Sequence, residues 1–223
     1  MSPRWTGQTV YFIDFEGSRA SGVLEYGVVA LHEGRIMDTT TRLCRAVGPV
    51  RPEDAAVHGL RESEVAGEAP FAAEWEYFTT LRERGPLAAH YAHVENALLK
   101  SVWPYPRNSP DFARPGGRLA EWGPWIDTGR LYGQLYRGLP SGKLEALVAA
   151  CGLQVELDAA ARTCCPAGRR RYHAALYDAL AGALLLARLA VDPEVADKSM
   201  GWLLAMSTLN PEKRDALRQD EWI

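Results

Sequence analysis

A chain of 223 residues with 47% hydrophobic and 24% charged side chains predicts one globular domain with room for a small appendage. Its formal net charge of −3 excludes a protein that coats nucleic acid through many phosphate contacts, because such domains are strongly basic. Any role on nucleic acid must therefore depend on a local site, on contact with only a few nucleotides, or on metal ions that supply positive charge.

The sequence predicts neither a membrane span nor an export signal. Its longest apolar stretch, residues 174–191, is interrupted by Asp178 and Arg188 and predicts a core helix. Residues 1–10 lack an apolar stretch followed by a small-residue cleavage site, so we expect a cytoplasmic protein. The four cysteines, which include the adjacent Cys164 and Cys165, are then expected as free thiols.

The first elements in chain order are strands. Residues 9–14 are dense in β-branched and aromatic side chains, and residues 23–44 contain two more such runs around the turn dipeptide Glu33-Gly34. These three strands predict an antiparallel meander.

Helical periodicity follows the meander. Residues 71–84 predict a helix that ends at Gly85, because apolar residues recur at spacings of three and four: Phe71, Trp75, Phe78 and Leu81. Residues 86–92 predict a short buried strand, and residues 93–102 a second helix.

The second half of the chain is mainly helical. Prolines and glycines in residues 103–118 predict irregular structure, and residues 125–128 a short strand. Further helices are predicted at residues 128–136, 143–150 and 172–189, and the tail after Asp192 resembles two short helices with a frayed end. Three strands followed by alternating helix and strand predict an α/β domain with a mixed sheet covered by helices.

Two acids stand at the end of the first strand. Asp14 and Glu16 point to the same face, because side chains alternate along a strand. Burying two such carboxylates without a partner is costly, so a cation is the natural resolution, and hard oxygen ligands favour Mg²⁺ or Mn²⁺ over zinc. The alternative is that one acid caps the following turn and the other faces solvent.

Two further acids and a histidine suggest a larger site. Glu95 lies just inside the predicted helix 93–102, and Asp178 lies on the apolar helix 172–189. Small residues around Asp178 would let this helix approach the sheet closely and bring Asp178 beside Asp14: Ala174, Ala175, Ala179 and Gly182. His173 lies near the start of that helix, and an imidazole suits a general base at neutral pH. Each residue also has a structural alternative, Asp178 facing water and His173 serving the fold.

The motifs occur in an order that carries more weight than any one of them. The segments are "FIDFEG" from residue 12, "EYGVVAL" from 25, "AAVHGL" from 55, "AAHYAHVENALL" from 88, "WIDT" from 125 and "YHAALYDA" from 172. This order resembles that of the DEDDh family of 3′-to-5′ exonucleases, which includes the proofreading exonucleases of DNA polymerases. The resemblance spans roughly residues 9–189 and implies a ribonuclease-H-like fold.

The resemblance also implies roles for the acids and the histidine. Asp14 would bridge two divalent ions, Mg²⁺ or Mn²⁺, while Glu16 and Asp178 complete the shell of one ion and Glu95 serves the other. His173 would take the proton from the attacking water. The implied activity is hydrolysis of single-stranded DNA or RNA from the 3′ end, releasing nucleoside 5′-monophosphates.

Candidate substrate-binding residues follow from the same resemblance. The backbone N–H groups of Gly17 and Ser18 would meet the terminal sugar or phosphate, and His58 with Leu60 would wedge the last base. Tyr91 stands where the family usually has asparagine; it either alters how the terminal nucleotide is held or simply packs.

One departure from the family concerns the second motif, where Glu95 replaces an aspartate. The longer side chain keeps a charge and oxygen ligands but leaves the rate and the preferred ion open. An alternative function is therefore a catalytically weakened nucleic-acid-binding or polymerase-accessory module.

The resemblance divides the chain into two parts. Residues 1–190 would form the exonuclease domain, with an irregular insertion at 103–125, and residues 191–223 a C-terminal helical tail. The insertion would either stack bases or pack its tryptophans on the domain or on a second subunit. A homodimer or a polymerase-type partner is a possible assembly, and no membrane is expected.

Overall fold

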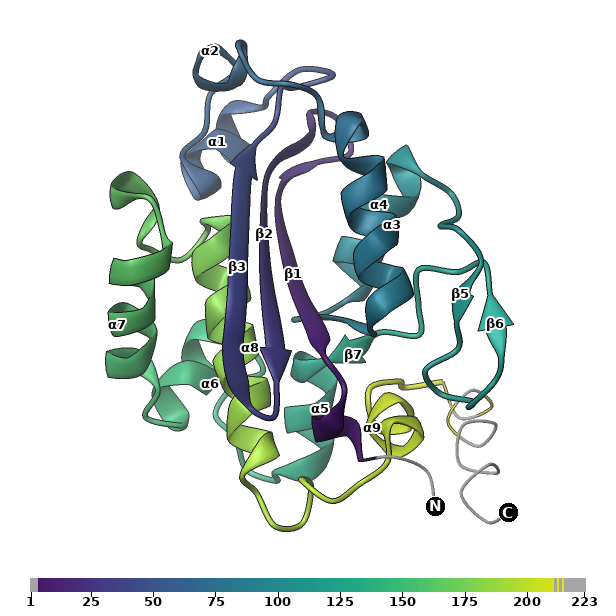
Figure 1. Cartoon of the computed structure of the whole chain (residues 1–223). Coiled ribbons are helices and arrows are strands. Elements are labelled where there is room, and N and C mark those ends of the chain that lie inside the picture. The colour runs from purple at the N-terminus through teal and green to yellow at the C-terminus, as the bar shows by residue number, and fades with distance from the viewer. Residues whose placement is uncertain (1–3, 211, 213, 215–223) are drawn as a thin grey trace.

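A five-stranded mixed sheet is the centre of the molecule (Figure 1). The computed structural model describes residues 4–210, 212 and 214. The strands follow the order β3-β2-β1-β4-β7, with β1, β2 and β3 antiparallel and β4 and β7 parallel to β1. They are β1 (Val10–Ser18), β2 (Gly22–His32), β3 (Arg35–Leu43), β4 (Leu87–Ala89) and β7 (Ile126–Asp127). The predicted meander and the mixed sheet are confirmed.

Helices flank the sheet and cap its ends. Those in the first half are α1 (Pro52–His58), α2 (Glu62–Val65), α3 (Trp75–Arg84) and α4 (His93–Val102). Those in the second half are α5 (Thr128–Leu135), α6 (Leu144–Ala150), α7 (Gln154–Cys164), α8 (Ala175–Ala190) and α9 (Met200–Met206). Short 3₁₀ turns are η1 (Trp5–Gly7), η2 (Phe71–Glu74) and η3 (Ala167–Arg169). A second small sheet pairs β5 (Ser109–Pro110) with β6 (Arg118–Leu119).

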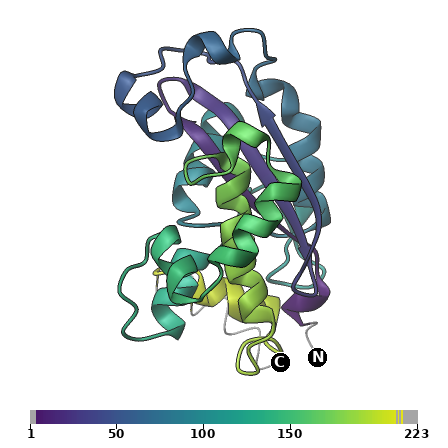
Figure 2. The ribbon, with the colours of Figure 1, turned by 90° about the vertical axis from the view of Figure 1, so that its left-hand side faces the viewer.

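The two faces of the sheet bury separate cores, because side chains alternate along each strand. Val10 and Phe12 of β1 point to the face covered by α8, where the larger core continues into α5, α6, α7 and α9. Ile13 and Phe15 point to the opposite face, where an aromatic core joins α3 and α4. Figures 1 and 2 show α7 lying outside α8, on the side away from α3 and α4. Side chains two residues apart in a strand point to the same face of the sheet, so Asp14 and Glu16 lie on the same face as Phe12, the one that α8 covers.

Helix α8 lies unusually close to the sheet at two glycines. A Cβ added to Gly27 of β2 would lie 2.4 Å from backbone atoms of Ala175 and Leu176. A Cβ added to Gly182 of α8 would lie 2.1 Å from the Phe12 ring. Both contacts require a residue without a side chain, so these glycines allow the close packing that was expected from the small residues of this helix.

Several boundaries differ from the sequence prediction. Helix α8 begins at Ala175, not at residue 172, because His173 has a φ of 61° and Ala174 is extended. The short helices α1 and α2 and the longer α7 were not predicted. The segment 103–118 was predicted to be irregular, but it contains β5 and pairs it with β6.

The insertion 103–125 packs against the domain. Trp122 is fully buried in the aromatic core. Arg82 of α3 is 1% exposed and donates hydrogen bonds to three insertion carbonyls, those of Pro110, Glu121 and Gly123. Of the two alternatives for the insertion, the contacts favour packing of its tryptophans on the domain.

The C-terminal segment is part of the main core as far as it is described. Buried residues of α9, among them Leu203 and Leu204, belong to the α8-face core. The Ser207 hydroxyl accepts a hydrogen bond from the Asp127 backbone at 3.0 Å. The second helix predicted for the tail falls largely outside the described residues. Within them, no helix is long and apolar enough to cross a membrane.

Candidate active site

Strand β1 presents Asp14 and Glu16 at its carboxyl end, toward α8. A bulge after Glu16 shifts the register of the pairing with β2, which continues through Gly17 and Ser18. Gly17 has a φ of 131°, and a Cβ there would lie 2.2 Å from the Gly22 carbonyl oxygen. Only glycine suits this close turn, which leaves the two carboxylates where the strand turns away.

Asp178 comes from the first turn of α8, on the same side of the sheet. It is 7% exposed, and its Oδ2 accepts a hydrogen bond from the His173 backbone N–H at 3.0 Å. This bond links the helix to the loop that carries His173. The close approach at Gly27 places the start of α8 directly over β2, beside the acids of β1.

Glu95 enters from α4 through a tightly held turn. The Asp127 carboxylate accepts hydrogen bonds from the backbone N–H groups of Tyr91 at 3.1 Å and Ala92 at 3.0 Å. Tyr91 itself has a φ of 57°, which sets the direction in which α4 begins. Glu95 is 5% exposed, and the nearby Phe15 backbone of β1 favours the charged form of its carboxylate.

The four carboxylates raise one another's pKa values because they are buried and close together. Burial, followed by the Glu95 and Asp178 charges, raises the pKa of Asp14 well above its usual range. Burial and Asp178 raise the pKa of Glu16 to about 8, and burial and Glu16 do the same for Glu95. Burial raises the pKa of Asp178 to about 7, although the His173 backbone hydrogen bond opposes this. Among the described residues, Glu16, Asp178 and His173 form the group whose ligand atoms lie within 4.8 Å of one another, and Asp14 and Glu95 interact electrostatically with these acids.

This cluster offers oxygen ligands that no protein donor satisfies. Within the described part of the chain, Glu95 Oε2 and Asp178 Oδ1 are buried without a hydrogen-bond partner. Ligand atoms of Glu16, Asp178 and His173 lie within 4.8 Å of one another. Buried anionic oxygens without donors fit hard divalent cations, so the donor set suits Mg²⁺ or Mn²⁺.

His173 is exposed above the acids, on the loop between η3 and α8. Its φ of 61° is uncommon for a residue with a side chain, so the surrounding contacts must hold it there. An exposed imidazole next to buried carboxylates can exchange protons with solvent.

The predicted substrate-binding backbone at Gly17 and Ser18 is partly engaged. The Ser18 N–H donates to Ser21 Oγ at 3.0 Å, inside the β1–β2 hairpin. In this arrangement Ser18 would have to leave Ser21 before its amide could bind a nucleotide.

His58 and Leu60 lie beneath the surface. Leu60 is 4% exposed and packs with Leu24 and Val65 in a small core of its own. His58 is 2% exposed, and its Nδ1 accepts a hydrogen bond from the Leu60 N–H at 3.1 Å. A base could touch this pair only after the side chains rearrange, and the observed contacts are those of packing.

Tyr91 also makes packing contacts. Its ring lies against Gly129 and Gly142, where added Cβ atoms would come within 2.8 Å and 2.4 Å of the tyrosine. The Arg130 guanidinium lies 5.4 Å from the ring centroid. These contacts favour the packing alternative for Tyr91.

One acid of this region, Glu25, was missed by the sequence analysis. Glu25 pairs directly with Glu16 across β1 and β2 and is 2% exposed. It forms a bidentate ion pair with Arg169 through Nε and Nη2. The available signal was an acid in the otherwise apolar segment "GVLEYGVVAL".

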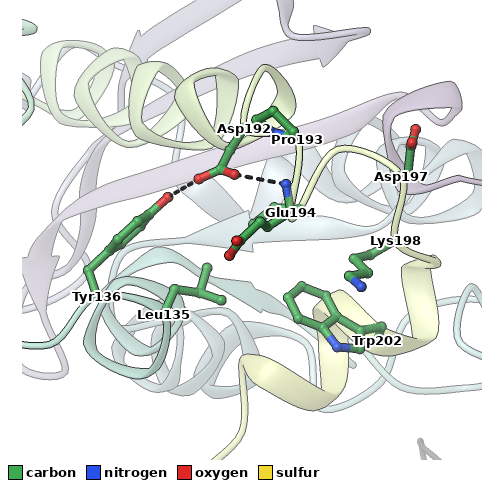
Figure 3. Close-up of a pocket in the computed structure, with 9 residues that line it drawn as sticks. Leu135, Tyr136, Asp192, Pro193, Glu194, Asp197, Lys198 and Trp202 are labelled. Atoms are coloured by element: carbon green, nitrogen blue, oxygen red, sulfur yellow. Dashed lines mark hydrogen bonds between the residues drawn. The ribbon is translucent and has the colours of Figure 1, made fainter.

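A separate hollow lies at the α9 end of the molecule. It measures about 420 Å³ and is lined by the end of α5 and the segment leading into α9. Figure 3 shows Asp192 at its rim, accepting hydrogen bonds from the Tyr136 hydroxyl at 2.6 Å and the Glu194 N–H at 2.9 Å. None of the predicted site residues lines it.

Comparison with known proteins gives the fold but no family by sequence. No protein-family model matches the chain, and no curated protein matches it in sequence. Among solved structures, Exonuclease X in complex with 5′ overhanging duplex DNA has a TM-score of 0.63 and 23% identity, covering 87% of this chain and 99% of that one. The nuclease domain of 3′hExo, a DEDDh family member bound to rAMP, has a TM-score of 0.60 and 17% identity, covering 86% and 96%.

A longer structure is similar over part of its length. E. coli Exonuclease I in complex with a dT13 oligonucleotide has a TM-score of 0.65 and 15% identity. The match covers 94% of this chain but 46% of that one, so the present chain spans about half of Exonuclease I. The fold is thus that of the ribonuclease-H-like DEDDh exonucleases, as the order of motifs predicted.

Proposed function

We propose that the protein is a metal-dependent 3′-to-5′ exonuclease that removes nucleoside 5′-monophosphates from single-stranded ends. The observation that carries the proposal is the cluster of half-buried Asp14 with buried Glu16, Glu95 and Asp178, in which two buried oxygens have no donor among the described residues. The mutual repulsion of these four acids is costly, and bound divalent cations would offset it.

The acids would divide between two cations. Asp14, whose pKa is raised by the charges of Glu95, Asp178 and Glu16, would contact both ions. Glu16 and Asp178 would hold one ion, and the free Oε2 of Glu95 would face the other. When bound, such ions neutralise the phosphate and stabilise the charge that develops on the attacking and leaving oxygens.

His173 would act as the general base. Its exposed ring lies within reach of the Glu16 and Asp178 oxygens, at the open side of the cluster. A neutral imidazole there takes a proton from the attacking water and passes it to solvent. The backbone N–H of His173 also donates a hydrogen bond to Asp178, which fixes the position of the general base relative to this carboxylate.

The substrate class follows from the structural neighbours by analogy. Those structures hold duplex DNA with a 5′ overhang, a dT13 oligonucleotide and rAMP, so both DNA and RNA ends are candidates. Gly17 remains the candidate for contact with the terminal nucleotide, because it adjoins Glu16 at the strand end. Assembly as a homodimer, or with a polymerase-type partner, stays a prediction.

Digestion of matched DNA and RNA oligonucleotides tests the proposal. Each is labelled at the 5′ end and incubated with Mg²⁺ or Mn²⁺, with Asp14→Asn as the inactive control. A ladder that shortens from the 3′ end, with 5′-monophosphates as products, is expected. Intact substrate with both ions, despite binding of the oligonucleotide, would favour the accessory-module alternative.

A further inference from the structure

We propose that Arg169 and Glu25 form a positioning pair that holds His173 over the carboxylate cluster. The inference rests on the proposed nuclease function, since it assigns the means by which the general base is oriented. Neither residue is assigned to contact the substrate.

Arg169 joins three separate segments through one guanidinium. It pairs with Glu25 of β2, with Nε donating to Oε1 at 3.0 Å. It also donates to the His58 carbonyl at the end of α1 at 2.6 Å and to the His173 carbonyl at 3.2 Å. The arginine side chain is 13% exposed and the glutamate side chain 3%, so the pair is shielded from solvent. A planar guanidinium with five donors can make such a set of bonds, whereas an ammonium group cannot.

Glu25 differs from the four acids of the proposed metal site in how its oxygens are used. Oε1 accepts from Arg169, and Oε2 accepts from Arg169 and from the Ala175 backbone N–H at 3.0 Å. Glu95 Oε2 and Asp178 Oδ1, by contrast, have no donor within the described residues. Glu25 is thus a fifth acid of the region, but its oxygens accept hydrogen bonds from protein groups and are not left to coordinate a cation.

The pair holds the backbone that follows the Cα atom of His173, and Asp178 holds the N–H that precedes it. Arg169 holds the His173 carbonyl, Asp178 holds its N–H, and Glu25 holds the N–H of Ala175. These bonds over-determine a backbone conformation that is unfavourable for histidine, with φ at 61°. Without the pair, the loop would relax toward ordinary φ values and the imidazole would leave the cluster.

A double-mutant cycle on turnover tests this role. Arg169→Ala should lower kcat by about 10- to 100-fold with KM changed less than threefold, and Arg169→Lys should recover only part of the loss. In the His173→Ala background, Arg169→Ala should cost less than twofold, because the base that it positions is gone. Arg170→Ala is the matched control, since Arg170 donates to the Cys165 and Arg162 carbonyls and contacts neither Glu25 nor His173.

Hydrogen exchange gives a readout that needs no activity. Arg169→Ala and Glu25→Gln should each increase amide exchange at His173 and Ala175 at least tenfold, while the middle of α8 keeps its protection. Additive losses in the cycle, or unchanged exchange at these two amides, would overturn the positioning role. A wild-type protein without nuclease activity would instead refute the proposed function, and the exchange measurement would still decide the role of the pair.

Discussion

At the scale of single residues, the site is defined by what its polar atoms bond to. Glu25 has both oxygens satisfied by protein donors, whereas Glu95 and Asp178 each keep a buried oxygen without one. The distinction separates a structural acid from candidate ligands, although all of them are buried carboxylates within one region. Predictions at this scale concern His173 and Glu95.

Replacing His173 with alanine should separate metal binding from chemistry. We expect His173→Ala to lower kcat by about 10²- to 10⁴-fold, the usual contribution of a general base, and to leave Mn²⁺ affinity within threefold. Steady-state kinetics and calorimetric titration measure the two effects. His32→Ala, at the other end of β2 from Glu25, serves as the control. A large loss of Mn²⁺ affinity would mean that His173 is a ligand, which its distance from Glu16 and Asp178 also permits.

Glu95→Gln should stabilise the metal-free protein at high pH. Burial raises the pKa of Glu95 to about 8, above its value of about 4.3 in an unfolded chain. The folded state therefore binds the proton more tightly, and stability that is fully present below about pH 4 is lost as pH rises toward 8. Glutamine cannot ionise, so the variant should gain on the order of 4 kcal/mol at pH 8 and about 1 kcal/mol at pH 5. Urea unfolding in EDTA measures this. An equal change at both pH values, or one matched by the exposed Glu156→Gln, would contradict it.

At the scale of elements, the site depends on how closely α8 approaches β2. A Cβ at Gly27 would lie 2.4 Å from the backbone of Ala175, and backbone atoms cannot step aside as a side chain can. Helix α8 carries Asp178, and its preceding loop carries His173. The spacing between the helix and the sheet therefore sets the size of the carboxylate cluster.

Gly27→Ala should push α8 outward. We expect a loss of about 2–3 kcal/mol of stability from overpacking and at least a tenfold loss of Mn²⁺ affinity. The control is Gly133→Ala in α5, where a Cβ meets nothing within 4 Å and alanine should stabilise the helix by about 0.5–1 kcal/mol. Thermal unfolding and metal titration on both variants check this. Retained metal affinity in Gly27→Ala would show that the site tolerates a different helix position.

The elements also show what could be predicted from the sequence. Runs of β-branched and aromatic residues predicted β1, β2 and β3, apolar spacings of three and four predicted α3, and the motif order placed the four acids in one region. The pattern could not show that Gly27 is a contact point, because an isolated glycine in a strand has several explanations. It also could not show the Glu25–Arg169 pair, whose members lie 144 positions apart in the chain.

At the scale of the whole molecule, the charge state of the carboxylate cluster affects both folding stability and the binding of nucleic acid. The net charge is only −3, so the four clustered acids concentrate ionisable carboxylates at one place in a nearly balanced molecule. Where these carboxylates are ionised, they repel a polyanionic substrate until cations occupy the cluster. Metal binding should therefore govern both folding stability and nucleic-acid affinity.

Removal of divalent ions should lower the melting temperature. At an Mn²⁺ concentration 100 times the dissociation constant, binding to the native state adds about 2.7 kcal/mol to the free energy of unfolding. The shift between EDTA and Mn²⁺ in a thermal scan should be larger at pH 8 than at pH 5, because protons compete for the same carboxylates. An equal shift at both pH values would point to ion binding away from the cluster.

Calorimetric titration of the metal-free protein with Mn²⁺ at pH 8 tests the central claim most directly. The convergence of Asp14, Glu16, Glu95 and Asp178 predicts saturable binding of two ions per chain, with proton release, and loss of both in Asp14→Asn. No saturable binding at millimolar Mn²⁺, or the same binding in Asp14→Asn, would contradict it.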